Sequence, residues 1–154
     1  MLSPDFKEFI ELLNKHNVLY IVIGGYALAL HGHPRYTKDI DIWIDVDAEN
    51  AQKMITVIQE FGFSSVGLKE SDFLESGNVI QLGLPPNRID ILTSADGVDF
   101  TECFANILNI EIDNIYINFI DINNLIKNKK NTGRLQDLAD VEKLELSQQN
   151  KDDT

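Results

Sequence analysis

The spacing of apolar residues changes twice in the first third of the chain. Over residues 4–16 they recur at helical spacing behind the capping pair Ser3-Pro4, which predicts an amphipathic helix. Residues 18–23 are apolar throughout and mostly β-branched, so they predict a strand that is buried on both faces. A short helix over residues 26–31 is expected next, and a loop that contains Pro34 follows it.

Strict alternation then marks a second strand over residues 39–45. Its isoleucines occupy one face, while Asp39 and Asp41 occupy the other. A helix is expected to begin after the capping residue Asp47 and to end at Gly62. Residues 70–75 predict one further helical turn.

Two hairpins are expected in the second half of the chain. Segments 79–84 and 88–92 flank the turn sequence Pro85-Pro86-Asn87, and segments 110–112 and 115–120 flank Asp113-Asn114. Three more helices are expected, over residues 99–108, 122–130 and 134–146. Because strands and helices alternate early and hairpins follow, the pattern favours an α/β (α+β) fold, a mixed β-sheet flanked by helices.

Length and composition are those of one ordinary globular domain. The chain has 154 residues, of which 44% are hydrophobic and 25% charged, close to the average for soluble proteins. We expect a single domain over residues 1–147 and a disordered tail over residues 148–154. The lone Cys103 excludes an intramolecular disulfide framework and a cysteine-based zinc site.

Charge and hydropathy limit the surroundings in which the chain works. The first residues lack the basic and apolar regions of a signal peptide. The longest apolar run, 18–30, is shorter than the ~20 residues that span a bilayer. We therefore expect no membrane contact and a cytoplasmic location. The net charge of −12 argues against broad, non-specific binding to nucleic acid.

Two features suggest a site for a phosphorylated ligand and a metal. Gly24-Gly25 lies between the first strand and the next helix, where a backbone without side chains can approach a phosphate, although a tight turn is the commoner explanation of a glycine pair alone. Asp39 and Asp41 share one strand face and repel each other. A divalent cation with oxygen ligands would relieve that repulsion, and a solvated strand face is the alternative.

A third acid extends this pattern. Asp90 is central in the strand 88–92 and faces away from Ile89 and Ile91. If this strand lies beside the first acidic strand, three carboxylates form a site for one or two Mg²⁺ ions. An isolated exposed acid is the alternative.

Basic residues are concentrated in two places. Arg35 and Lys38 come just before Asp39. The other group lies in a stretch without acids and comprises Lys127, Lys129, Lys130 and Arg134. Such groups suit a triphosphate or a polynucleotide acceptor, whereas a solvated helix end is the alternative for the second group.

The order of these features resembles the DNA polymerase β-like nucleotidyltransferase superfamily. In that family a hydrophobic residue and Gly-Gly or Gly-Ser precede an Asp-hydrophobic-Asp/Glu strand, and here the motif reads Ile23-Gly24-Gly25 … Asp39-Ile40-Asp41-Ile42. The wider run from Gly24 to Asp41 and the closing run from Lys130 to Asp140 look like small bacterial nucleotidyltransferases of the abortive-infection and toxin–antitoxin type. The resemblance covers residues 18–145.

The resemblance implies a nucleotidyltransferase (polymerase β-like) fold and a Mg²⁺-dependent transfer. An NMP group, AMP from ATP in the first instance, would move to a hydroxyl on a protein, an RNA or a small molecule, and pyrophosphate would leave. Asp39, Asp41 and Asp90 would be the catalytic acids and would bind one or two Mg²⁺ ions, with Mn²⁺ as a substitute. Asp90 would also activate the acceptor hydroxyl. The nucleotide-binding residues would be Gly24, Gly25, Arg35 and Lys38.

Partners and alternatives follow from what the chain lacks. Larger superfamily members carry a second domain that holds the base or the acceptor, so a partner protein or a homodimer is expected to complete this site, and a tRNA is one expected acceptor. The main alternative is a non-catalytic binding module, such as an antitoxin for a partner toxin. Glycosyltransferases also use an Asp-x-Asp pair but are usually much larger. A dinucleotide-binding site is excluded because Gly24-Gly25 lacks the third spaced glycine.

Overall fold

A six-stranded mixed sheet forms the centre of the protein. The computed structural model describes residues 2–33, 38–63 and 67–152. The strands are β1 (Tyr20–Ile23), β2 (Asp39–Ile44), β3 (Val79–Leu82), β4 (Arg88–Leu92), β5 (Leu108–Ile112) and β6 (Ile115–Phe119). They lie in the order β3-β4-β2-β1-β6-β5. Strands β2 and β4 are parallel, as are β1 and β6, while the other neighbours are antiparallel.

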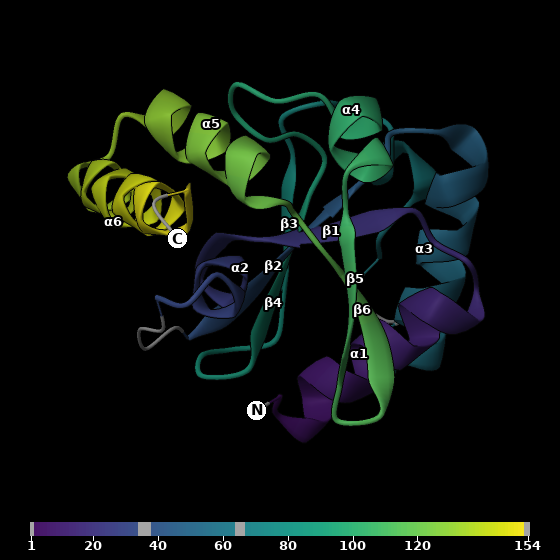
Figure 1. Ribbon diagram of the computed structural model, residues 1–154. Helices are drawn as coiled ribbons and strands as arrows, with labels where there is room; N and C mark the ends of the chain where they lie inside the picture. The colour runs from purple at the N-terminus through teal and green to yellow at the C-terminus, as the bar shows by residue number, and fades with distance from the viewer. Residues whose placement is uncertain (1, 34–37, 64–66, 153–154) are drawn as a thin grey trace.

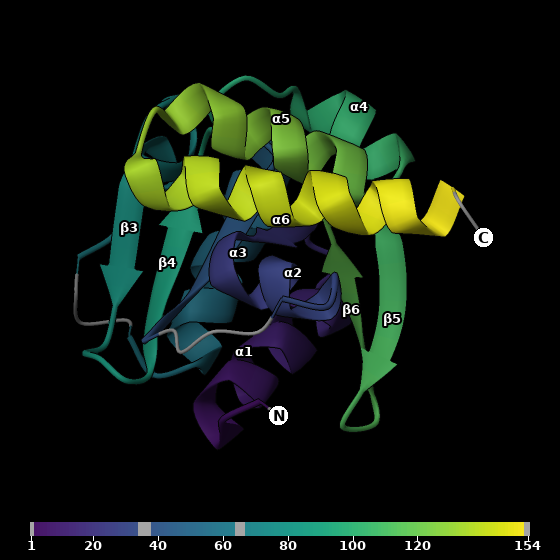
Figure 2. The same ribbon diagram turned by 60° about the vertical axis from the view of Figure 1, so that its left-hand side comes forward.

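Helices cover both faces of this sheet, so the expected architecture is confirmed (Figure 1). They are α1 (Pro4–Lys15), α2 (Gly24–Leu30), α3 (Ala48–Glu60), α4 (Phe100–Ala105), α5 (Ile122–Thr132) and α6 (Leu135–Asp152), with a 3₁₀ turn, η2 (Glu70–Phe73). Figure 1 shows α1 and α3 on one side of the sheet and α2, α5 and α6 on the other. In Figure 2, α5 and α6 lie side by side above α2.

The alternating pattern of β2 decides which face of the sheet carries the acids. Ile40, Ile42 and Ile44 are at most 1% exposed and belong to the main hydrophobic core. Each such side chain stabilises the fold by roughly 1.5–3 kcal/mol when fully buried. A slip of one residue in register would exchange these side chains for Asp39 and Asp41, so the core fixes the direction of both acids.

Two predicted helix caps are confirmed. The Ser3 hydroxyl accepts a hydrogen bond from the Phe6 backbone N–H (3.2 Å) at the start of α1. The Asp47 carboxylate accepts one from the Asn50 backbone N–H (3.2 Å) at the start of α3. Both bonds satisfy backbone donors that have no partner inside the helix.

Three boundaries differ from the sequence-based expectation. Helix α2 begins at Gly24, so the glycine pair forms its first turn instead of preceding it. Helix α4 ends at Ala105, because residues 108–112 form β5 and pair with β6. Helix α6 continues to Asp152, through part of the predicted disordered tail. A hydrogen bond from Gln148 Nε2 to Asn123 Oδ1 (2.6 Å) ties these last turns to α5.

Among the described residues, no helix combines the length and the apolar character needed to cross a membrane.

Candidate functional site

The pairing of β2 with β4 brings the predicted acids together. The two strands are parallel, with Asp41 opposite Asp90 and Asp39 opposite Arg88. Since side chains two residues apart share a strand face, all four point to the same side of the sheet. One carboxylate oxygen from each of the three aspartates lies within 4.8 Å of the others. The condition that the sequence left open, the adjacency of the two acidic strands, is therefore met.

The donor set of this cluster fits a hard divalent cation. Mg²⁺ and Ca²⁺ bind carboxylate oxygens at roughly 2.0–2.6 Å, so oxygens that share one ion lie within about 5 Å of each other. The spacing of the Asp39, Asp41 and Asp90 oxygens satisfies this limit. That these residues bind metal remains a prediction.

Gly24 forms the wall against which Asp41 lies. Its φ angle is +69°, a conformation that favours glycine, and a β-carbon at this position would collide with the Asp41 carboxylate. Gly24 and Gly25 also line the cavity in front of the acids. The structure thus places the predicted glycine pair directly beside the predicted metal ligands.

Arg88 is a member of this cluster that the sequence analysis did not identify. Its Nε and Nη2 donate to the two carboxylate oxygens of Asp90 at 2.8 and 3.0 Å. Its Nη2 also donates to Asp39 Oδ2 at 2.7 Å. The signal for it was present, because Arg88 precedes Asp90 by two positions in the same strand and must share its face.

The local environment favours the protonated forms of two of these acids. Burial raises the pKa of Asp41 to about 7, and the negative charges of Asp39 and Asp90 add to this effect. Burial also raises the pKa of Asp90, although the hydrogen bonds from Arg88 oppose the shift. A cation bound among the three acids would lower these pKa values and favour the charged forms.

The acids open into a cavity of about 620 Å³ between the sheet and the C-terminal helices. The sheet side contributes the acids and Arg88, and α2 contributes the glycine pair. The opposite wall comes from α5, α6 and the turn between them and comprises Asn128, Lys129, Thr132, Arg134 and Asp137. A cavity of this size accommodates a nucleotide-sized ligand.

A buried ion cluster holds α5 and α6 together in this wall. Lys129 is 3% exposed and its Nζ donates to Asp137 (3.1 Å) and Asp140 (3.0 Å). Asp137 also accepts from Thr132 Oγ1 and Arg134 Nε, both at 2.7 Å. The burial of Lys129 depends on how the two helices pack, which the sequence pattern of one helix does not show.

The stretch from Lys127 to Arg134 is therefore less basic in the fold than in the sequence. Lys129 and Arg134 pair with acids of α6, and Lys130 pairs with Glu145 at 2.7 Å. The reason is that α6 turns back along α5 and brings its acids alongside. Arg134 nonetheless keeps a side chain that is 75% exposed and lines the cavity.

Of the two basic residues expected to bind the nucleotide, the structure describes only Lys38. Arg35 falls outside the described residues. Lys38 is described and exposed, immediately before β2, and is not among the residues that line the cavity. Trp43, which follows the acids on the same face, is 3% exposed and packs edge-to-face against Phe100 with ring centres 5.1 Å apart. It is a core residue and does not offer a stacking surface for a base.

Solved structures share this fold. A protein from Thermotoga maritima described as a "putative nucleotidyltransferase" is 19% identical with a TM-score of 0.56, over 100% of this chain and 97% of that one. An "antigenic nucleotidyltransferase-like protein" from Paracoccidioides brasiliensis is 17% identical with a TM-score of 0.53, over 91% of this chain and 74% of that one. At these identities the likeness concerns the fold alone.

Comparison at the sequence level gives the family. No curated protein matches the chain significantly. A family model described as "Nucleotidyltransferase of unknown function (DUF6036)" matches residues 4–151, from the first helix into the last turn of the last helix. The resemblance to nucleotidyltransferases that the glycine pair and the acidic strands suggested is thereby confirmed, and the chain belongs to this nucleotidyltransferase family.

Proposed function

We propose that the protein is an enzyme, a Mg²⁺-dependent nucleotidyltransferase that moves an NMP group, AMP from ATP in the first instance, to an acceptor hydroxyl. The observation that carries this proposal is the cluster of Asp39, Asp41 and Asp90. Their carboxylate oxygens lie within 4.8 Å of one another and face a cavity of about 620 Å³ in a chain of the nucleotidyltransferase family.

The three aspartates would hold one or two Mg²⁺ ions, for which Mn²⁺ would substitute. When bound, the metal would neutralise the phosphates and stabilise the charge that develops on the attacking and leaving oxygens. Asp90 would accept the proton of the acceptor hydroxyl as its oxygen forms a bond to the α-phosphorus. The bond between the α-phosphorus and the bridging oxygen of pyrophosphate then breaks, and pyrophosphate leaves.

Other residues of the cavity would position the nucleotide. The backbone of Gly24 and Gly25 would face the phosphates, since it lines the cavity without side chains. Arg134 would donate to a phosphate from the opposite wall, because its guanidinium is exposed there while Asp137 holds Nε. Arg35 and Lys38 keep the nucleotide-binding role that the family resemblance implies for them.

The acceptor hydroxyl would belong to a protein, an RNA such as a tRNA end, or a small molecule. A partner protein, including a toxin or antitoxin, or a second copy of the chain would supply the acceptor or complete the site.

One observation favours a second candidate function, a non-catalytic binding module such as an antitoxin. Arg88 provides Asp39 and Asp90 with a positive partner from the protein itself. A cluster that is balanced in this way can be stable without metal, and the fold would then serve to bind a partner. Nucleotide binding that depends on metal separates the two candidates.

The test is calorimetric titration of ATP, GTP, CTP and UTP, with and without Mg²⁺, into the wild type and Asp41→Asn. Glu142→Gln is the matched control, since it also removes one negative charge but lies exposed on α6. We expect Mg²⁺-dependent binding that Asp41→Asn abolishes and Glu142→Gln preserves. Transfer of labelled nucleotide to cell-extract components then identifies the acceptor. Nucleotide binding that is absent, or that Asp41→Asn leaves intact, would favour the binding module.

A further inference from the structure

The guanidinium of Arg88 occupies the space between two of the three acids. It donates hydrogen bonds to both carboxylate oxygens of Asp90 and to Oδ2 of Asp39, with donor–acceptor distances of 2.7 to 3.0 Å. A cation shared by the same carboxylates would lie a few ångströms from the guanidinium. Repulsion between a divalent ion and a guanidinium at such a distance is several times the thermal energy, even with strong screening. Arg88 and a metal at the centre of the cluster therefore compete.

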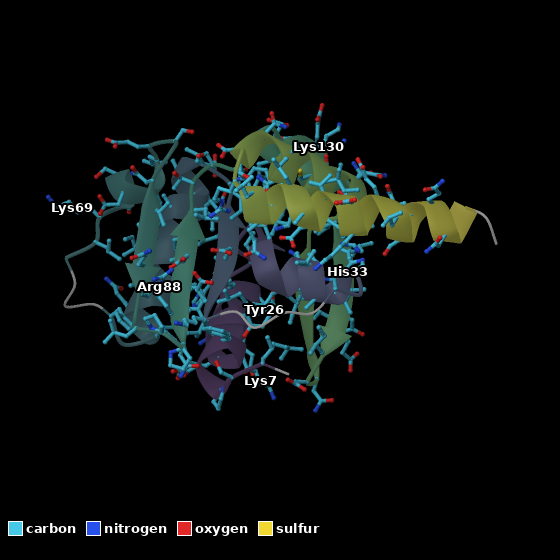
Figure 3. All side chains as sticks on the ribbon, turned by 90° about the vertical axis from the view of Figure 1, so that its left-hand side faces the viewer. Lys7, Tyr26, His33, Lys69, Arg88 and Lys130 are labelled. Atoms are coloured by element: carbon cyan, nitrogen blue, oxygen red, sulfur yellow. The ribbon has the colours of Figure 1, made fainter. Side chains whose placement is uncertain are left out.

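A side chain of Arg88 that leaves the acids can move into the cavity that it already lines. Its side chain is 27% exposed, more than that of Asp90 at 7%, and it lines the same cavity as Gly24 and Gly25. Figure 3 labels Arg88 on β4 and Tyr26 on the neighbouring helix α2. A guanidinium in this cavity presents a planar pair of N–H donors, the arrangement that binds phosphate oxygens best.

We propose that Arg88 is an internal counter-ion of the acid cluster, which a divalent cation displaces, and that the released guanidinium then donates to the phosphates of the nucleotide. Without metal, Arg88 holds Asp39 and Asp90 together and lowers their mutual repulsion. With metal, the same side chain becomes a phosphate ligand. Binding of metal and of nucleotide is therefore positively coupled through one residue, and this inference rests on the proposed function.

The test compares metal and nucleotide affinity in Arg88→Met, which keeps an unbranched apolar side chain and removes the charge. Mn²⁺ is titrated into the protein by calorimetry without nucleotide, and ATP is titrated at saturating Mn²⁺. We expect Mn²⁺ to bind at least about tenfold more tightly to Arg88→Met than to the wild type, because a repelling charge is gone. We expect ATP to bind at least about tenfold more weakly, because a charged phosphate donor is lost.

Two further variants control the experiment. Lys53→Met removes one positive charge on α3, far along the chain from β4, and should change neither affinity. Arg88→Lys keeps the charge but cannot bridge two carboxylates with a planar fork, so its Mn²⁺ affinity should fall between those of the wild type and Arg88→Met. If Arg88→Met does not fold, the Mn²⁺ affinity of Arg88→Lys relative to the wild type still tests the proposal. In the wild type, Mg²⁺ should shift the Arg88 Nε–H resonance in the NMR spectrum.

The outcomes separate this inference from the proposed function. Opposite changes of the two affinities in Arg88→Met support the inference, since a purely structural role would weaken both. If Asp41→Asn abolishes Mn²⁺ binding but Arg88→Met binds Mn²⁺ no more tightly than the wild type, Arg88 is a fixed structural partner and only this inference fails. If the wild type does not bind Mn²⁺, or if Asp41→Asn binds it as tightly as the wild type, the metal site is wrong. In that case both this inference and the proposed function fail. If Arg88→Met binds Mn²⁺ more tightly than the wild type but binds ATP with unchanged affinity, the released guanidinium does not donate to the phosphates, and that part of the inference is overturned.

Discussion

Asp41 fills the space in which a side chain on Gly24 would begin. A β-carbon built at Gly24 would lie about 3.0 Å from the Asp41 carboxyl carbon and still closer to Oδ2. The glycine motif and the acidic motif, which are separate in the sequence, are thus in direct contact in the fold through Gly24 and Asp41. The absence of a side chain at Gly24 allows the backbone of α2 to approach Asp41, and both residues line the cavity.

We expect Gly24→Ala to slow transfer strongly while the protein still folds. The positive φ angle alone should cost about 1–2 kcal/mol of stability. The collision with Asp41 should displace the carboxylate, and a misplacement of about 1 Å typically costs ~100-fold in rate. Gly67→Ala is the matched control, because Gly67 has nearly the same φ angle, +75°, with no atom within 4 Å of a β-carbon. Thermal melts and labelled-ATP transfer are measured on both. Equal loss of activity in both variants would assign the effect to backbone strain instead of the contact.

Asp90→Asn should separate catalysis from nucleotide binding. The asparagine keeps the shape of the side chain but cannot accept the proton of the acceptor hydroxyl. Loss of a general base lowers rates by roughly 10²–10⁴-fold. Asp39 and Asp41 remain, so we expect the affinity for ATP with Mg²⁺ to change by less than about tenfold. Single-turnover transfer and calorimetry on the same preparation check this. A parallel loss of binding and rate would show that Asp90 acts mainly in holding the nucleotide.

Local patterns were enough to predict the sheet and three acids of the candidate site. The period of two in residues 39–45 and 88–92 gave both the strands and the faces of their acids, because the isoleucines between the acids had to be buried. The same rule would have placed Arg88 beside Asp90. The contact of Arg88 with Asp39 depends on the pairing of β4 with β2, which the pattern of one strand does not reveal.

Contacts between distant segments were beyond local patterns. The burial of Lys129 depends on α6 folding back against α5, which spacing along one helix does not reveal. Likewise, the early end of α4 reflects the pairing of β5 with β6 and not a stop signal in its own sequence. In both cases tertiary packing decides between local alternatives of similar energy.

Lys129→Met should destabilise the protein far more than a surface lysine change. The substitution leaves Asp137 and Asp140 buried, at 3% and 1% exposure, without the ammonium between them. Removing one partner of a buried ion pair typically costs 3–5 kcal/mol, so we expect about that loss in urea denaturation. Lys143→Met, exposed on α6, should change stability by less than about 0.5 kcal/mol. Adding Asp140→Asn to Lys129→Met should cost less than Asp140→Asn does alone, since the acid is already uncompensated.

The stabilising effect of Asp137 should disappear in acid. Burial by itself would raise the pKa of this carboxyl, but hydrogen bonds from Thr132 and Lys129, together with the charge of Lys129, outweigh burial and lower the pKa below 3.8. A carboxyl whose pKa is lower in the folded state contributes stability above its unfolded pKa and loses it as the pH falls through the folded pKa. We therefore expect Asp137→Asn to cost about 3 kcal/mol near neutral pH and progressively less below about pH 4. Urea denaturation of the wild type and the variant across this range measures the difference, with Glu142→Gln as the exposed control on the same helix. A difference that stays constant from neutral to acid pH would mean that the asparagine acts through packing and not through the lost charge.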